Sequence, residues 1–104
     1  MNDINQTLEQ ISKDIENHKV MVYMKGDRNA PQCGFSGKVV HILNTLGVPF
    51  ESRNVLADPV LRDAIKQFSD WPTVPQLYVN GEFIGGCDIV SELYENGELQ
   101  ALLA

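Results

Sequence analysis

Five consecutive apolar residues, Val20 to Met24, constrain the fold of this 104-residue chain more than any other feature. An uninterrupted apolar run of this length is typical of a strand that is buried on both faces. We therefore predict that it is the central strand of a sheet. Apolar residues at helical spacing flank it, and they predict a first helix over Ile4 to Ile15 and a second from Gly34 to Leu46.

The remaining segments complete an alternation of helices and strands. Asp58 and Pro59 predict the N-cap and first position of a third helix, and Asn80-Gly81 predicts a tight hairpin turn. We expect strands over residues 50–55, 76–79 and 82–84, a loop over 26–32, and a C-terminal helix from Ile89 that is interrupted at Asn96-Gly97. The order α-β-α-β-α-β-β-α gives a right-handed parallel crossover followed by an antiparallel hairpin. This predicts an α/β domain of thioredoxin-like fold over residues 1–104, with a four-stranded mixed sheet flanked by helices and an additional N-terminal helix.

Composition excludes several classes of function. The formal net charge is −6 and no cluster of Lys and Arg is present, so we expect no nucleic-acid partner. No apolar run approaches the roughly 18 residues of a membrane helix, so we expect no membrane partner. Residues 1–7 have no basic and apolar leader pattern. We expect a cytoplasmic protein, with an organellar protein whose transit peptide has been removed as the alternative.

Cys33 lies where a polar loop meets the second helix. The N–H groups and dipole at a helix N-terminus stabilise a thiolate, which is both a nucleophile and a metal ligand. The alternative is a buried, inert cysteine. Ser36 stands where a Cys-X-X-Cys motif would have its second thiol, so a bond across that turn cannot form. An outside thiol or Cys87 must serve instead.

Two further segments predict a binding site beside Cys33. In a domain of thioredoxin type, Pro75 would be cis, which would leave the N–H and C=O of Val74 free to pair with an extended peptide. Residues 85–88, Gly-Gly-Cys-Asp, predict an anion site at a helix N-terminus, with Asp88 able to pair with an ammonium. The alternatives are an edge proline for the first segment and a plain turn with Asp88 as N-cap for the second.

Together these motifs resemble the monothiol, CGFS-type glutaredoxins. The resemblance covers nearly the whole chain and rests on Lys25, Cys33-Gly34-Phe35-Ser36, Trp71-Pro72-Thr73-Val74-Pro75 and Gly85-Gly86-Cys87-Asp88. It implies that the ligand is glutathione. By the same resemblance, Lys25 and Arg62 would hold the glycyl carboxylate, with Gln67 as a neighbour of that end. Val74 would pair with the cysteinyl backbone. Cys87 and Asp88 would hold the γ-glutamyl carboxylate and ammonium, mainly through backbone N–H groups and the Asp88 side chain.

The resemblance also implies a function in iron–sulfur cluster biogenesis. A [2Fe–2S] cluster needs four ligands, so Cys33 of two chains and two glutathiones would assemble a labile, transferable cluster. The chain would be a homodimer with the cluster and a monomer without it. A BolA-like protein and apo iron–sulfur proteins are the further partners implied.

Two alternatives stay open. One is a glutathione-dependent thiol–disulfide oxidoreductase, of at most weak activity, in which Cys33 removes glutathione from mixed disulfides. The other is a redox switch through a Cys33–Cys87 disulfide.

Overall fold

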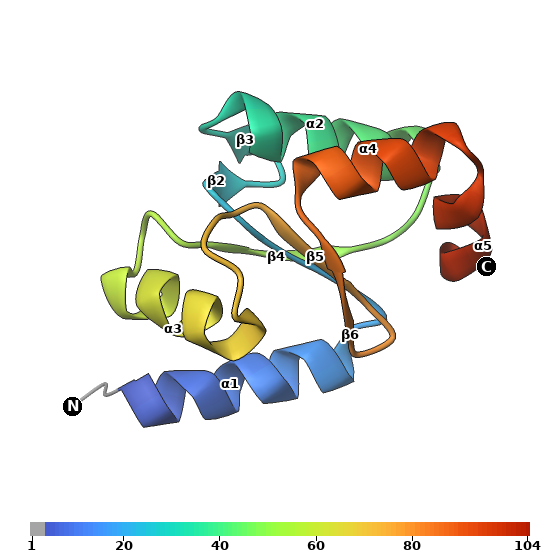
Figure 1. Cartoon of the computed structure of the whole chain (residues 1–104). Coiled ribbons are helices and arrows are strands. Elements are labelled where there is room, and N and C mark those ends of the chain that lie inside the picture. The colour runs from blue at the N-terminus through green and yellow to red at the C-terminus, as the bar shows by residue number, and fades with distance from the viewer. Residues whose placement is uncertain (1–3) are drawn as a thin grey trace.

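The computed structural model describes residues 4–104 of the chain. Figure 1 shows a sheet with helices on both of its faces. The elements in chain order are α1 (Ile4–Asn17), β1 (Val20–Met24), β2 (Gly26–Asp27), β3 (Ala30–Pro31), α2 (Gly34–Thr45), β4 (Glu51–Asn54), α3 (Pro59–Ser69), β5 (Gln76–Val79), β6 (Glu82–Gly85), α4 (Cys87–Glu95) and α5 (Glu98–Leu103).

The main sheet has four strands in the order β4-β1-β5-β6. Strand β1 pairs in parallel with β4, with Met21 opposite Glu51, and antiparallel with β5, with Val20 opposite Val79. Strands β5 and β6 form the terminal hairpin. The predicted four-stranded mixed sheet, with β1 in a central position, is therefore confirmed.

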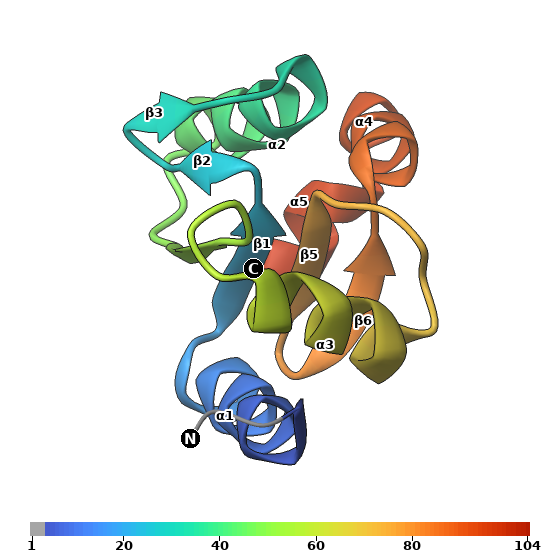
Figure 2. The same cartoon turned by 90° about the vertical axis from the view of Figure 1, so that its left-hand side faces the viewer.

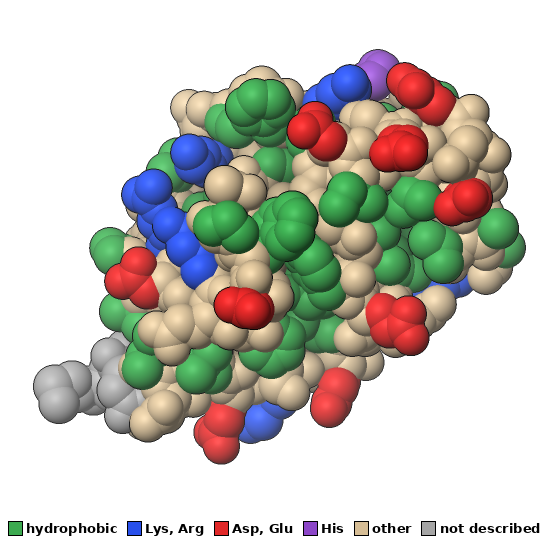
Figure 3. Space-filling model, viewed as in Figure 1, with side chains coloured by type: hydrophobic (Ala, Val, Ile, Leu, Met, Phe, Trp, Pro, Cys, Tyr) green, Lys and Arg blue, Asp and Glu red, His purple; other side chains and the backbone are tan. Residues whose placement is uncertain are grey.

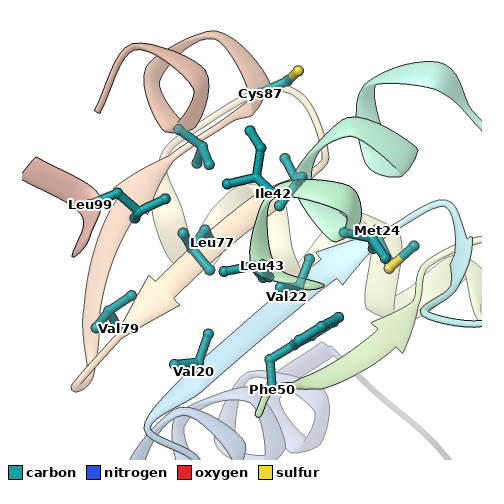
Figure 4. Packing of buried hydrophobic residues seen from close by; sticks show 13 residues of the cluster. Val20, Val22, Met24, Ile42, Leu43, Phe50, Leu77, Val79, Cys87 and Leu99 are labelled. Carbon is teal, nitrogen blue, oxygen red and sulfur yellow. The ribbon is translucent and has the colours of Figure 1, made fainter. Parts of the chain in front are cut away.

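Strand β1 is apolar throughout because each of its faces enters a different core. Val20, Val22 and Met24 belong to one buried cluster, whereas Met21 and Tyr23 belong to another. Figure 1 shows α2 and α4 on one side of the sheet and α1 and α3 on the other. The first cluster is drawn in Figure 4, where side chains of α2, such as Ile42 and Leu43, lie close to those of β1 and β5.

Local signals place the ends of α3 and of the hairpin. Asp58 is the N-cap of α3, and its carboxylate accepts hydrogen bonds from the Val60 and Leu61 N–H groups at 3.1 Å each. Asn80 and Gly81 both have positive φ, as a two-residue hairpin turn of type I′ requires. The expected interruption at Asn96-Gly97 separates α4 from α5, with Gly97 at φ 84°.

The segment over residues 26–32 differs from the predicted loop, because it contains the short antiparallel hairpin β2–β3. The Asp27 carboxylate closes its turn by accepting the N–H groups of Asn29 and Ala30. Contacts with distant residues hold the hairpin against the sheet. The Arg28 guanidinium donates to the Phe50 carbonyl and lies 4.4 Å from the centre of the Phe50 ring.

None of the helices over residues 4–104 combines the length and apolar character needed to cross a bilayer.

Candidate functional site

A pocket of about 390 Å³ opens where segments distant in the sequence meet. Its walls come from the end of β1, the start of α2, one face of α3, the segment before β5, and the start of α4. The lining residues are Lys25, Cys33, Phe35, Arg62, Lys66, residues 71–75 and residues 86–89. All six predicted site residues, Lys25, Cys33, Arg62, Val74, Cys87 and Asp88, line this one pocket.

Cys33 is the N-cap residue of α2, with extended backbone angles of φ −153° and ψ 145°. Its thiol is a free, partly exposed group, so the expectation of an accessible cysteine holds over the buried, inert alternative. Burial raises the pKa of Cys33, but hydrogen bonds from Ser36 and from the Phe35 N–H, together with the Lys25 charge, lower it by more. The pKa of this thiol is therefore held below its usual value.

Ser36 has a hydroxyl where a Cys-X-X-Cys motif would have its second thiol, and this hydroxyl has two hydrogen-bond partners. The side chain is fully buried, and its Oγ accepts the backbone N–H of Lys25 at 3.1 Å. The same hydroxyl donates toward Cys33 and helps to lower the pKa of the thiol. Ser36 thus connects the end of β1, where Lys25 enters the pocket, to the reactive sulfur.

The Val74–Pro75 peptide bond is cis, as the sequence predicted. Val74 lines the pocket, and within residues 4–104 neither its N–H nor its C=O takes part in a hydrogen bond. An extended ligand could pair with both groups, as an added strand does at a sheet edge.

The start of α4 forms the opposite wall, and the alternative in which Asp88 is the N-cap of this helix is wrong. The N-cap is Gly86, and Asp88 is exposed in the first turn. Gly86 lies close to the neighbouring wall, since a Cβ there would come within 3.3 Å of the Pro75 carbonyl oxygen. Small residues at this position therefore let the helix N-terminus approach the cis-proline segment.

Charges in the pocket are separated by element. Lys25 comes from the end of β1, Arg62 and Lys66 come from α3, and Asp88 comes from α4. Helices α3 and α4 lie on opposite faces of the sheet (Figure 1). In Figure 3, basic side chains gather on the side of the molecule where α3 and β2 lie, with exposed hydrophobic side chains beside them.

Sequence reasoning missed one basic residue of the pocket, Lys66. Gln67 is exposed and does not line the pocket, whereas Lys66, which was not singled out, does. The signal was available, because residues four apart lie on the same face of a helix, and Lys66 follows Arg62 by four. The aromatic residues Phe35 and Trp71 also line the pocket. Phe35 is 64% exposed beside Cys33.

Cys33 and Cys87 are both free thiols on this pocket, and Cys87 is buried at the start of α4 (Figure 4). Among the described residues 4–104, no three or more His, Cys, Asp or Glu side chains come together as a group that could hold a metal ion.

A low-pKa thiol at a helix N-terminus, next to a cis-proline on a mixed four-stranded sheet, defines a thiol protein of the thioredoxin-like class. The sequence pattern of the Glutaredoxin family matches residues 20–84. A relative from Synechocystis, described as an uncharacterized monothiol glutaredoxin ycf64-like, is 58% identical over 98 residues, 94% of this chain and 92% of its own length. The chain belongs to the glutaredoxin family and is a monothiol glutaredoxin.

Solved structures agree with this assignment. Reduced apo GrxS14 from poplar is 51% identical, with a TM-score of 0.77 and coverage of 94% of this chain and 87% of that one. A buckwheat glutaredoxin solved as a glutathione complex has a TM-score of 0.86, with coverage of 96% and 89%. At 23% identity, the buckwheat structure supports the fold alone.

Proposed function

We propose that this chain binds glutathione in the pocket and uses it, with Cys33, to assemble and transfer a labile [2Fe–2S] cluster between two chains. The single observation that carries the proposal is the composition of the pocket: one accessible, low-pKa thiol faces a set of charges that suits one zwitterionic thiol peptide.

Glutathione has two carboxylates, one ammonium, a short peptide backbone and a thiol. Lys25, Arg62 and Lys66 supply cations for the glycyl carboxylate. The unpaired N–H and C=O of Val74 suit the cysteinyl backbone. The N-terminus of α4 suits the γ-glutamyl carboxylate, and the exposed Asp88 suits the ammonium. The net charge of −6 disfavours anions at long range, so this local arrangement must account for binding.

The cluster is cargo in this proposal. Its irons require four ligands, usually thiolates. Cys33 supplies one per chain, and Ser36 offers no second thiolate across the turn. Glutathione thiols from two chains complete the set, so the cluster-bound form is a homodimer and the apo form is a monomer. Ligands that can exchange with solution make the cluster easy to release to an apo iron–sulfur protein. A BolA-like protein in place of the second chain is a further partner that the proposal allows, and a reducing, cytoplasmic setting is its expected location.

The second candidate function is deglutathionylation, which the accessible low-pKa thiol also suits. The Cys33 thiolate would attack the glutathione sulfur of a mixed disulfide and release the substrate thiolate. A second glutathione thiolate would then attack the Cys33 adduct and release oxidised glutathione. The sulfur–sulfur bond is exchanged twice, and no other reductant is needed.

The deciding experiment is anaerobic reconstitution with iron and sulfide, with and without glutathione, followed by visible absorption and native mass. We expect one [2Fe–2S] cluster per two chains, only with glutathione. Cys33→Ser should abolish it, and Cys87→Ser, the matched control on the same pocket, should retain it. A colourless monomer that turns over glutathione mixed disulfides rapidly would reject the cluster proposal in favour of the oxidoreductase.

A further inference from the structure

The pocket wall over residues 71–75 is an irregular segment with two prolines. All five of its residues line the pocket, and it presents the unpaired backbone groups of Val74. Pro72 and Pro75 have no N–H to donate, so the segment cannot be held by a regular backbone ladder. Its shape must depend on side chains behind it.

Gln76 is the side chain behind this wall. It is 0% exposed and does not line the pocket. Its Nε2 donates to the carbonyl oxygens of Thr73 at 3.1 Å and Trp71 at 3.4 Å. One buried amide therefore satisfies two carbonyls of the wall, on either side of Pro72.

Tyr78 fixes the other end of the Gln76 amide. The Tyr78 hydroxyl donates to Gln76 Oε1 at 3.1 Å. Burial raises the pKa of Tyr78 to about 12, with the Ser69 hydroxyl opposing the shift, so the phenol stays protonated and remains a donor. Its ring is packed edge-on against Tyr23, Phe68 and Phe83, which leaves it little freedom to turn.

The chemistry of this position is specific to an amide. A glutamine can donate two hydrogen bonds from one nitrogen and still accept one at its oxygen. A glutamate of the same shape keeps the acceptor for Tyr78 but has at most one O–H to donate, and only when protonated, so at least one of the Trp71 and Thr73 carbonyls loses its donor. A leucine leaves the Trp71 and Thr73 carbonyls without the donor that Gln76 supplies, and it removes the acceptor to which the Tyr78 hydroxyl donates.

We propose that Gln76 is a positioning residue that sets the peptide-binding geometry of the pocket, because it holds residues 71–74 in the conformation that presents the Val74 N–H and C=O to the ligand. The proposal rests on the proposed binding of glutathione. A purely structural role for Gln76 would lower stability without a selective effect on binding, and that difference is measurable.

The test compares four proteins: the unaltered chain, Gln76→Glu, Tyr78→Phe and Tyr23→Phe. The two tyrosine variants are a matched pair, because both rings lie in the same cluster at 5.9 Å from each other. Of these two tyrosine hydroxyls, that of Tyr78 donates to Gln76. The buried Tyr23 hydroxyl has no hydrogen-bond partner among the described residues.

Glutathione affinity is measured by calorimetry, and the pH profile of Cys33 alkylation is measured alongside it. We expect Gln76→Glu to weaken binding roughly tenfold, Tyr78→Phe to weaken it roughly threefold, and Tyr23→Phe to leave it unchanged. The alkylation profile should stay the same in all four, because Gln76 does not contribute to the Cys33 pKa. Binding by Gln76→Glu within twofold of the unaltered chain, or equal losses in both tyrosine variants, would overturn the proposal.

A second readout does not need the ligand. Trp71 is the chain's single tryptophan and lies in the wall, with its ring centre 5.7 Å from that of Phe83. Its fluorescence in the free protein should shift in Gln76→Glu and Tyr78→Phe but not in Tyr23→Phe. If the unaltered chain does not bind glutathione, the proposed function fails. If the Trp71 fluorescence is unshifted in both Gln76→Glu and Tyr78→Phe, the positioning role of Gln76 is rejected independently of glutathione binding. Should Gln76→Glu fail to fold, Tyr78→Phe decides the question.

Discussion

Replacing Gly26 by alanine should destabilise the hairpin that connects β1 to the reactive thiol. Gly26 has φ +86°, and a Cβ there would lie 2.5 Å from the Ala30 carbonyl oxygen and 2.6 Å from the Gln32 nitrogen. Both are backbone atoms, so the hairpin itself must move. The left-handed conformation costs alanine about 1–2 kcal/mol, and overpacking adds about 1–3 kcal/mol. The reduced entropy of the unfolded chain returns about 0.4–1 kcal/mol, which leaves a net loss of about 3 kcal/mol.

Thermal unfolding followed by circular dichroism measures this loss. For a domain of about 100 residues, 3 kcal/mol corresponds to a melting temperature lower by roughly 10–20 °C. Gly37→Ala is the matched control, because Gly37 lies within α2 and a Cβ there meets only Pro31, at an ordinary 3.7 Å. Alanine should stabilise that site by about 0.5–1 kcal/mol. A Gly26→Ala protein that melts within roughly 2 °C of the unaltered chain would refute the reasoning.

Three other predictions follow from the site. The Cys33 thiol ionises at lower pH in the folded chain than in the unfolded one, because its pKa is lowered by folding. Between that lowered pKa and the usual value of 9.0, the unfolded state therefore binds more protons than the folded state. The free energy of unfolding should consequently rise with pH across that window. Urea midpoints should therefore rise there for the unaltered chain but not for Cys33→Ser, and parallel curves would contradict the lowered pKa. Asp58→Ala should lower the free energy of unfolding, measured by urea denaturation, by about 1 kcal/mol. Asp58→Ser should retain most of this stability, because serine also caps helices. Equal losses in the two variants would reject a capping role. Lys66→Gln and Arg62→Gln should each weaken glutathione binding roughly threefold in calorimetry, with less effect at high salt, and no loss for Lys66→Gln would remove it from the site.

The parts of the fold that sequence predicts well are those with local causes. The two-sided burial of Val20 to Met24 produces its apolar run, and positive φ at Asn80 and Gly81 follows from the turn they form. The β2–β3 hairpin could not be predicted in this way. Its strands have two residues each, and Arg28 holds it through contacts with the distant Phe50.

The site residues, too, were predictable where their signal is local and were missed where it depends on the tertiary structure. Cys33 and Asp88 were identifiable because a helix start is a local feature, although Gly86 and not Asp88 is the N-cap of α4. Lys66 was missed even though its spacing from Arg62 predicts a shared helix face. Gln76 gave no signal, because a polar residue at the start of a strand usually faces solvent, and only the tertiary structure places it behind the pocket wall.

The hydrogen bond of Ser36 affects how a chain of this kind could evolve a second thiol. Its buried Oγ accepts the Lys25 N–H at 3.1 Å, and a cysteine at this position would offer only a sulfur, which is a weak acceptor. A mutation from Ser36 to cysteine therefore disturbs the strand end that carries Lys25. A single mutation to cysteine would thus add a thiol and weaken this hydrogen bond together, so selection for a descendant with two thiols would act on both effects at once.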